Sequence, residues 1–370
     1  MITKEILSSD KRTKLKYFES CVVEHTAMEK VKEQLISYIE NPAGASILLV
    51  LGPSGVGKTT LVEAVMSYFI TKLKSELEQN GGRVPIARVE LVGSDSGLFN
   101  WKDYYYRSLE ELKEPLIDKK VNLLIKSEAK PKTVIPYHSR NTAPELRRSL
   151  ENALKYREPV ALLIDEAQHL LKVANAKRLQ DQLDSIKSLA NMSKVPHVLV
   201  GTYELKDFIS LSGQLSRRTM NVHFPRYRIN NEEEYHTFLS VIHALQQNIP
   251  LTEKTNLLEH SEFIYERTLG CIGILKDWLT RCLGEAIDNN KHSIDKKLLN
   301  KHAMPINALK LLFEEIEQGE SLFKDNEYGR RDLLYRLGMK TISTADEKST
   351  DKQDQLIVGR RKPTRDSVGK

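Results

Sequence analysis

Cysteine is scarce in this sequence of 370 residues, and long apolar runs are missing. The three cysteines, Cys21, Cys271 and Cys282, are too few and too far apart for a disulfide framework or a zinc site. No stretch approaches the roughly 20 consecutive apolar residues that a membrane-spanning helix needs. The N-terminal segment lacks the apolar core of a secretion signal. We therefore expect a cytoplasmic protein without a membrane partner.

A strong excess of one charge is missing as well. The sequence has 56 Lys and Arg residues against 50 Asp and Glu residues, which gives a net charge of +6. The basic residues are concentrated between Lys102 and Arg148, with 11 against 7 acidic residues, and in 360–370, with five against one. Such segments are typical of a surface for an acidic partner, or simply of a solvated surface and a soluble tail.

The apolar pattern predicts an α/β protein in two parts. Short apolar segments alternate with helical patterns as far as about residue 230, which is typical of a parallel sheet covered by helices, and helical patterns alone follow. The predicted strands are 47–51, 86–92, 160–164, 197–200 and 222–224. Helices are expected over 28–39, 59–77, 177–191 and 204–215, and over 98–158 with interruptions at 130–132 and 135–136. The predicted divisions are a loosely held arm (1–20), a nucleotide-binding α/β domain (21–230), a helical lid with C-terminal helices (231–336) and a basic, disordered tail (337–370).

The most specific motif follows the first predicted strand. Residues 52–59 read GPSGVGKT, which satisfies the G-x-x-x-x-G-K-[ST] pattern of a P-loop at each fixed position. Its glycines let successive backbone N–H groups point at phosphate oxygens, and the following helix presents the positive end of its dipole. Lys58 is expected to neutralise the β and γ phosphates of ATP, and Thr59 to bind Mg²⁺. The predicted nucleotide-binding residues of this segment are Gly52, Pro53, Ser54, Gly55, Val56, Gly57, Lys58, Thr59 and Thr60.

Polar and charged residues end the later strands. The third predicted strand ends on Asp165 and Glu166. We expect Asp165 to hold Mg²⁺ through water, and Glu166 to orient and polarise the attacking water. Thr202, after the fourth strand, is a candidate sensor of the γ-phosphate, or a simple strand cap. Arg217 and Arg218 are candidates for stabilising γ-phosphate charge across a subunit boundary, although an ordinary surface pair has the same pattern.

In this order the elements resemble an AAA+ ATPase: an α/β P-loop NTPase with a parallel sheet covered by helices, followed by a small helical lid domain. More narrowly, the chain resembles the TnsC/TniB regulators of DNA transposition, loosely over residues 20–290. The segments that carry the resemblance are GPSGVGKTT (52–60), VALLIDEAQHL (160–170), HVLVGTYEL (197–205), QLSRRT (214–219) and TLGCIGILKDWL (268–279).

The narrower resemblance implies an ATP-dependent homo-oligomer, a ring or a helical filament, wound on double-stranded DNA. It implies contacts with the DNA backbone from Lys102 and Thr142, for which a solvated helix surface is the alternative. It also implies adenine contacts near Val23 and His25, although His25 fits a surface histidine equally well. Lys276 stands in the lid where such proteins often carry a nucleotide-sensing arginine.

The predicted function is therefore an ATPase that uses ATP and Mg²⁺, assembles on DNA and links a target-selection protein to a transposase. The selector can be an RNA-guided complex or a DNA-binding protein. DnaC-like helicase loaders and ExeA-like secretion ATPases share the same core motifs and are the alternatives. A scaffold with negligible hydrolysis is a third possibility, against which the intact Lys58, Asp165 and Glu166 argue.

Overall fold

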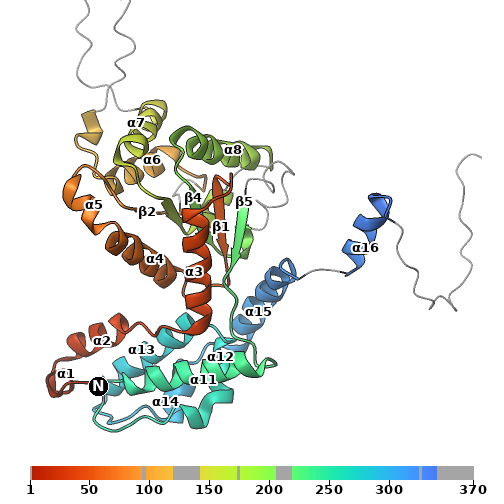
Figure 1. Cartoon of the computed structure of the whole chain (residues 1–370). Coiled ribbons are helices and arrows are strands. Elements are labelled where there is room, and N and C mark those ends of the chain that lie inside the picture. Colours follow the sequence, from red (N-terminus) through yellow and green to blue (C-terminus); the bar gives the residue numbers. More distant parts are fainter. Residues whose placement is uncertain are drawn as a thin grey trace, which may run out of the picture. The chain divides into compact units, whose positions relative to one another are not determined.

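In the computed structural model, residues Met1–Phe323 form one compact unit and Lys324–Lys370 form a second. The first unit contains a parallel sheet with its covering helices and a bundle of helices that follows it (Figure 1). No helix in the described residues is long and apolar enough to cross a membrane. The structure describes residues 2–93, 97–119, 142–172, 176–205, 219–324 and 327–339.

A parallel sheet, five-stranded within the described residues, forms the centre of the first unit in the order β2-β3-β4-β1-β5. This confirms the predicted α/β fold class, and each predicted strand overlaps an observed one. Because all the strands run in the same direction, their carboxyl ends meet at one edge of the sheet. The strands are β1 (Ile47–Leu51), β2 (Ala87–Glu90), β3 (Leu162–Asp165), β4 (His197–Gly201) and β5 (Thr219–His223).

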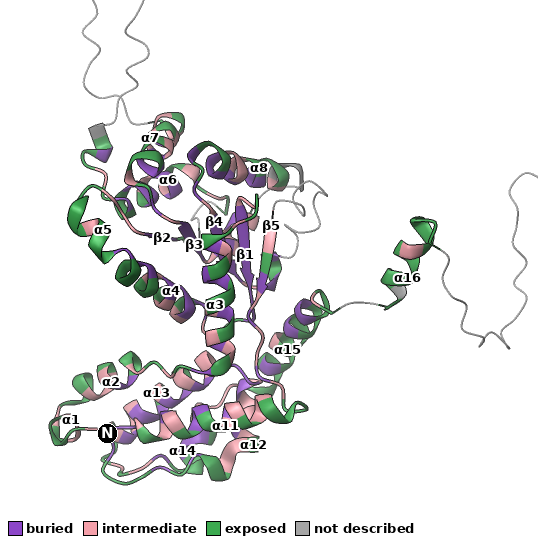
Figure 2. Cartoon of the chain, in the orientation of Figure 1, coloured by how far each residue is buried: buried purple, intermediate pink, exposed green. Residues whose placement is uncertain are grey.

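Different helices cover the two faces of the sheet, because alternate residues of a strand point to opposite faces. In β1, Leu48 and Val50 pack with α3 and α4, whereas Leu49 and Leu51 pack with α6, α7 and α8. Figure 2 shows β1 in the colour of buried residues. Burial on both faces explains why β1 is apolar throughout. The covering helices are α3 (Thr26–Glu40), α4 (Lys58–Lys72), α6 (Trp101–Glu111), η1 (Ile117–Lys119), α7 (Ala143–Arg157) and α8 (Ala176–Ser193). The short helix α5 (Lys74–Gln79) follows α4 and has no buried residue.

The helices that follow the sheet have a hydrophobic core of their own, which we call the lid core. Trp278 and Leu279 are buried in it, and the Trp278 indole donates to the carbonyl oxygen of Leu299 at 3.1 Å. The predicted helical part after the sheet is thus confirmed, while its boundary at residue 230 stays a prediction. Its helices are α11 (Glu232–Gln247), η5 (Leu258–His260), α12 (Ser261–Thr268), α13 (Ile272–Asp288) and α14 (Lys296–His302).

The N-terminal residues differ from the loosely held arm that we expected over 1–20. They form α1 (Lys4–Ser8) and α2 (Lys11–Ser20), and α2 packs against α13 of the lid. Phe18 is fully buried in the lid core. Leu15 also packs against the lid core, and the Tyr17 hydroxyl donates to Oδ1 of Asn248 at 3.3 Å. These few contacts stand among many charged neighbours, which explains why the sequence pattern was too weak to indicate a packed helix.

One further helix of the first unit, α15 (Ile306–Ser321), packs back onto η4 (Tyr203–Leu205) beside the sheet. In the second unit the structure describes α16 (Glu327–Arg336). Most of the predicted tail, 340–370, lies outside the described residues, as does the segment 120–141 between η1 and α7.

Candidate functional site

The P-loop joins β1 to α4 at the carboxyl edge of the sheet, and its shape requires its glycines. Gly55 and Gly57 have φ angles of 73° and 112°, in the left-handed region that residues with a Cβ rarely adopt. At Gly52, an added Cβ would lie 2.5 Å from the carbonyl oxygen of Phe224. The loop therefore winds tightly before α4 begins at Lys58. In this arrangement backbone N–H groups and a helix N-terminus face the same place, which favours an anion.

Lys58 turns back over the loop from the first residue of α4. Its ammonium group donates to the carbonyl oxygens of Gly52, at 3.1 Å, and of Pro53, at 2.8 Å. Burial lowers the pKa of Lys58, although the nearby carboxylates of Glu166 and Asp165 act in the opposite direction. A phosphate could replace the two neutral acceptors, because a charged acceptor forms the stronger hydrogen bond with an ammonium group.

Asp165 and Thr59 meet at a place that fits a magnesium ion. The Thr59 hydroxyl lies 3.4 Å from Oδ2 of Asp165, whose side chain is 1% exposed. Both groups offer the hard oxygens that Mg²⁺ prefers. No group of three or more His, Cys, Asp or Glu side chains that could hold a metal ion occurs in the part of the chain that the structure describes. Mg²⁺ held here would therefore take its other ligands from water and from nucleotide phosphates, which is its usual mode of binding.

A glutamine that sequence reasoning missed connects the second acid to the end of β4. Glu166 has a φ of 53° directly after β3, and its carboxylate accepts a hydrogen bond of 2.5 Å from the Gln168 amide. The Gln168 amide oxygen accepts the backbone N–H of Thr202 at 3.4 Å. The Thr202 hydroxyl is buried and has no hydrogen-bond partner among the described residues. Gln168 thus joins two predicted catalytic residues, and its place two positions after the acid pair could have indicated it.

Arg217 and Arg218 lie outside the described residues, as does most of the helix that we predicted over 204–215. The described chain resumes at Thr219, the first residue of β5. The role of these arginines stays a prediction.

Val23 and His25 lie between α2 and α3, where the sheet and the lid meet. Nδ1 of His25 caps α3 by accepting the N–H of Met28 at 3.2 Å, and it lies 2.6 Å from the Tyr227 hydroxyl. Burial lowers the pKa of His25 to about 4, so its ring is neutral near pH 7. Val23 packs against the lid core. His25 is therefore a buried capping residue and not a surface histidine, while adenine contact by either residue stays a prediction.

Lys276 has partners other than the predicted nucleotide. Its ammonium group donates to the carbonyl oxygens of Glu19, at 2.5 Å, and of Cys21, at 2.8 Å. These bonds join the lid helix α13 to the end of α2. Nucleotide sensing by Lys276 stays a prediction, and it would require these two bonds to break.

The lid reaches the P-loop through two glycines. The backbone N–H of Ile274, in the first turn of α13, donates to the carbonyl oxygen of Gly55 at 3.2 Å. A Cβ at Gly273 would lie 2.5 Å from the same oxygen, so the close approach requires glycine. Nothing in the sequence around Gly273 indicates this contact, because it joins segments that are far apart in the chain.

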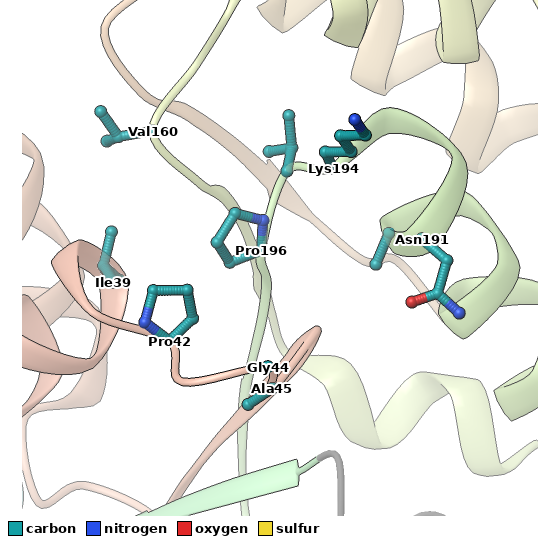
Figure 3. A pocket seen from close by; sticks show the side chains of 10 residues that line it. Ile39, Pro42, Gly44, Ala45, Val160, Asn191, Lys194 and Pro196 are labelled. Carbon is teal, nitrogen blue, oxygen red and sulfur yellow. The ribbon is translucent and has the colours of Figure 1, made fainter.

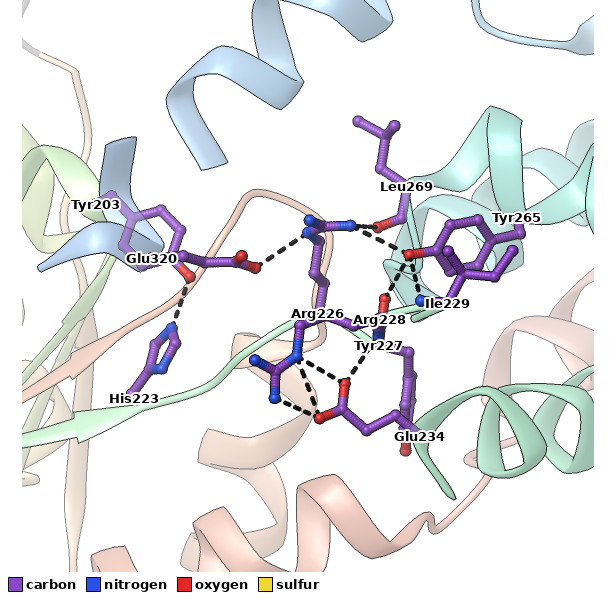
Figure 4. A network of polar contacts seen from close by, with 10 residues as sticks. All are labelled: Tyr203, His223, Arg226, Tyr227, Arg228, Ile229, Glu234, Tyr265, Leu269 and Glu320. Carbon is purple, nitrogen blue, oxygen red and sulfur yellow. Dashed lines mark hydrogen bonds and ion pairs between the residues drawn. The ribbon is translucent and has the colours of Figure 1, made fainter. Parts of the chain in front are cut away.

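The helix α15 packs against the end of the sheet through Gly319. A Cβ at Gly319 would lie 2.1 Å from the Tyr203 ring, so the helix backbone lies directly on the ring. The Tyr203 hydroxyl bonds Nε2 of His223 at 2.8 Å (Figure 4), and His223 stacks on Phe323 with ring centroids 4.1 Å apart. Burial lowers the pKa of His223 to about 4 and leaves its ring neutral. These aromatic contacts hold α15 against the ends of β4 and β5.

Arg226, just after β5, connects α15 with the lid (Figure 4). Its guanidinium pairs with Glu320 of α15 at 3.0 Å, and these side chains are 11% and 10% exposed. The same guanidinium donates to the Tyr265 hydroxyl and to the Leu269 carbonyl oxygen, at 3.2 Å each. Loss of one member of such a pair is costly, because it leaves the other charge buried and unpaired. The pair therefore fixes the position of α15 relative to the lid.

A cavity of about 430 Å³ lies between the P-loop, the end of β4 and α15. Pro53 and Ser54 line it from the loop, Thr202 from the strand end, and Leu312 and Glu315 from α15. The cavity thus brings two predicted motifs together with a helix that the sequence did not connect to them.

A second cavity, of about 470 Å³, lies at the opposite edge of the sheet (Figure 3). Most of its lining residues are apolar, as are Ile39 and Pro196, and Lys194 is its charged residue. The lining contains no acid, base or nucleophile pair that would indicate chemistry, and we assign it no role.

The two predicted DNA-binding residues lie at the starts of neighbouring helices. Lys102 is exposed in the first turn of α6, and Thr142 is the exposed capping residue of α7. In the second turns of these helices, Arg147 of α7 lies beside the Tyr105 hydroxyl of α6. At the other end, Arg157 of α7 donates to the backbone just after α6. The helices therefore run in the same direction, with their N-termini at the same end.

Comparisons with known proteins identify the fold. Residues 41–209 match the family model of an AAA domain, and no curated protein matches the sequence. The chain is similar to the solved structure of ORC2 from Aeropyrum pernix in ADPNP–ADP complexes, with 16% identity, a TM-score of 0.50 and coverage of 80% of this chain and 73% of that one. It is similar to ORC1 from Aeropyrum pernix in complex with DNA, with 15% identity, a TM-score of 0.50 and coverage of 80% and 67%. The chain therefore has the AAA+ P-loop NTPase fold, and its residues 41–209 match an AAA domain.

Proposed function

We propose that this protein is an ATP-dependent regulator of DNA transposition. It binds and hydrolyses ATP with Mg²⁺, assembles as a ring or filament on double-stranded DNA, and links a target-selection protein to a transposase. One observation carries the nucleotide part of the proposal: Lys58, Thr59, Asp165 and Glu166 converge at the carboxyl edge of the sheet.

Each group at this edge has surroundings that support a role in ATP hydrolysis. Lys58 binds the β and γ phosphates, and bound Mg²⁺ supplies positive charge that offsets the charge of the transferring phosphoryl group. Glu166, held by Gln168, orients the attacking water and accepts its proton. The buried Thr202 hydroxyl is placed beside the P-loop, which supports a hydrogen bond to the γ-phosphate.

The proposed assembly depends on the arginine pair that precedes β5. In the proposed oligomer, Arg217 and Arg218 of one subunit stabilise negative charge on the γ-phosphate held by its neighbour. ATP then lies between subunits, so the presence of ATP controls whether the oligomer forms.

Double-stranded DNA is the partner that α6 and α7 support. Lys102 and Thr142 lie at the N-terminal ends of two helices that run in the same direction, where helix dipoles favour phosphate. A basic side chain and a hydroxyl contact phosphates without reading the bases. ORC1 from Aeropyrum pernix, which shares this fold, has been solved in complex with DNA, and this supports the same class of partner here.

The transposase is the narrowest part of the proposal. It rests on the resemblance of 197–205, 214–219 and 268–279 to TnsC/TniB regulators. In this role the DNA-bound oligomer marks the place at which insertion occurs.

DNA binding with a non-hydrolysable ATP analogue tests the proposal. We expect filter retention of duplex DNA, and rings or filaments in negative-stain micrographs, only when the analogue is present. Lys102→Ala should weaken binding and reduce the slope of log affinity against log salt by about 0.9, because one phosphate contact per subunit is lost. Lys155→Ala, in the last turn of α7, is the matched control and should change neither the DNA affinity nor its dependence on salt. Absence of duplex binding with any nucleotide contradicts the proposal.

Two assays separate the alternatives. Release of phosphate, measured with and without DNA, distinguishes an ATPase from a scaffold with negligible hydrolysis. Copurification distinguishes a transposase from a helicase or a secretion component as the client. A helicase loader would need an arm for its partner, and the packing of Phe18 in the lid core leaves less of residues 1–20 available for that purpose.

A further inference from the structure

Arg88 of β2 directs its guanidinium at the carboxylate that is expected to hold Mg²⁺. Its Nη2 lies 2.8 Å from Oδ2 of Asp165, the same oxygen that the Thr59 hydroxyl approaches at 3.4 Å. The strand register explains the contact. Glu90 pairs with Asp165 across the sheet, and Arg88, two residues earlier on the same face, reaches Asp165 diagonally.

Two more carboxylates lie near the same guanidinium. Glu63 of α4 and Glu90 each have an oxygen 3.8 Å from Arg88. Their side chains are 60% and 65% exposed, against 1% for Asp165. Nε of Arg88 is buried and has no hydrogen-bond partner among the described residues. Arg88 thus has one short contact with a buried acid and two exposed acids close enough to accept its hydrogen bonds instead. Its Nε–H is a donor without a partner among the described residues.

We propose that Arg88 is a positioning residue that exchanges partners when the nucleotide site is loaded. It neutralises Asp165 when no metal is bound there, and it turns to Glu63 and Glu90 when Mg²⁺ binds with ATP. The inference rests on the nucleotide part of the proposed function.

Competition for one oxygen is the physical reason for the exchange. A carboxylate that is almost completely buried needs a compensating charge, because desolvation is costly. Arg88 supplies that charge and fixes the direction of the Asp165 carboxylate. Mg²⁺ or its water ligand needs the same oxygen, and two cations beside one carboxylate repel each other. The exposed acids offer the guanidinium new charge-assisted hydrogen bonds, so it need not move fully into water.

The exchange predicts that two kinds of substitution change metal affinity in opposite directions. Arg88→Gln removes the competing cation and should tighten metal binding by about tenfold. The double variant Glu63→Gln with Glu90→Gln removes the two carboxylates to which the guanidinium would turn. It should weaken metal binding by about threefold. An arginine that only braces the fold would not produce opposite effects.

Mn²⁺ is a suitable probe, because electron paramagnetic resonance follows its binding directly. The full-length protein is titrated with Mn²⁺ at a saturating concentration of a non-hydrolysable ATP analogue, for the wild type and the variants above. Arg83→Gln is the matched control. The Arg83 side chain is also 21% exposed, and its ion pair with Glu76 lies before β2, so Mn²⁺ affinity should not change.

Thermal melting gives a second readout. Arg88→Gln should lower the melting temperature of the metal-free protein more than that of the complex with Mn²⁺ and the analogue. If the wild type binds Mn²⁺ and both variants bind it with the same affinity, this inference is wrong and the proposed nucleotide function stands. No Mn²⁺ binding by the wild type overturns the nucleotide function and this inference with it. If Arg88→Gln does not fold, the double variant decides: weaker binding supports the exchange, and unchanged binding overturns it.

Discussion

The sheet side and the helical side of the candidate site are built in different ways. On the sheet side, local backbone conformation places the reactive groups, as at Gly57 in the P-loop and at Glu166 after β3. On the helical side, contacts between distant segments place α13 and α15, as at Gly273 and at Glu320. The first side carries the chemistry, whereas the second determines how closely the helices cover it.

This difference predicts two kinds of effect from substitutions. A change to a reactive side chain on the sheet side, such as Glu166, should alter the chemical step and leave the fold stable, because it leaves the packing unchanged. A change on the helical side should alter stability or nucleotide affinity, because it changes how two parts of the fold pack. The four predictions below test this division, from the largest expected effect to the smallest.

Glu166→Gln should have the largest effect. The amide cannot accept a proton from the attacking water, so the rate of phosphate release should fall by about 10³-fold. The affinity for ATP should stay within about twofold, and DNA-bound assemblies should last longer. Glu158→Gln is a matched control, because Glu158 has a similar φ of 47° and follows α7, outside the site. A normal rate of phosphate release in Glu166→Gln would show that Glu166 does not activate the attacking water.

The same difference explains how much of the molecule could be predicted from sequence. The strand–loop–helix around Lys58 was predictable because its motif is continuous, and Asp165 was predictable because it ends an apolar strand. Phe18, Gly273 and Gly319 could not be recognised in this way. A single aromatic residue or glycine has no visible partner in a sequence, and its importance appears only when a distant segment packs on it.

Glu320→Gln should have the next largest effect, on stability. The substitution leaves the Arg226 guanidinium buried without its counter-charge, which should lower the free energy of unfolding by about 2 kcal/mol. Urea unfolding measures this change. Glu317→Gln, at an exposed position of the same helix, should change stability by less than about 0.5 kcal/mol. Equal losses in the two variants would show that the ion pair does not hold α15.

Gly273→Ala should have a smaller effect, on nucleotide affinity. The new methyl group would lie 2.5 Å from the Gly55 carbonyl oxygen, so the start of α13 must move away from the P-loop. We expect about tenfold weaker binding of a fluorescent ATP analogue, with the hydrolysis rate at saturation largely unchanged. The control is Gly284→Ala in the same helix, where the nearest atoms are 4.0 Å away. Equal affinity of both variants would show that the contact between the lid and the P-loop does not contribute to nucleotide binding.

The smallest effect should come from His25, which lies where the two sides meet. Burial lowers its pKa from the ordinary 6.5 to about 4, so the unfolded chain binds more protons between these values. The contribution of His25 to stability is therefore complete above about pH 6.5 and is lost as the pH falls towards 4.

His25→Asn tests this contribution, because asparagine keeps a helix-capping acceptor but does not titrate. Between about pH 7 and pH 5, the melting temperature should fall less in the variant than in the wild type. Some acid sensitivity should remain in both proteins, because burial also lowers the pKa values of His197 and His223 to about 4. Equal falls would mean that protonation of His25 does not loosen the junction between sheet and lid.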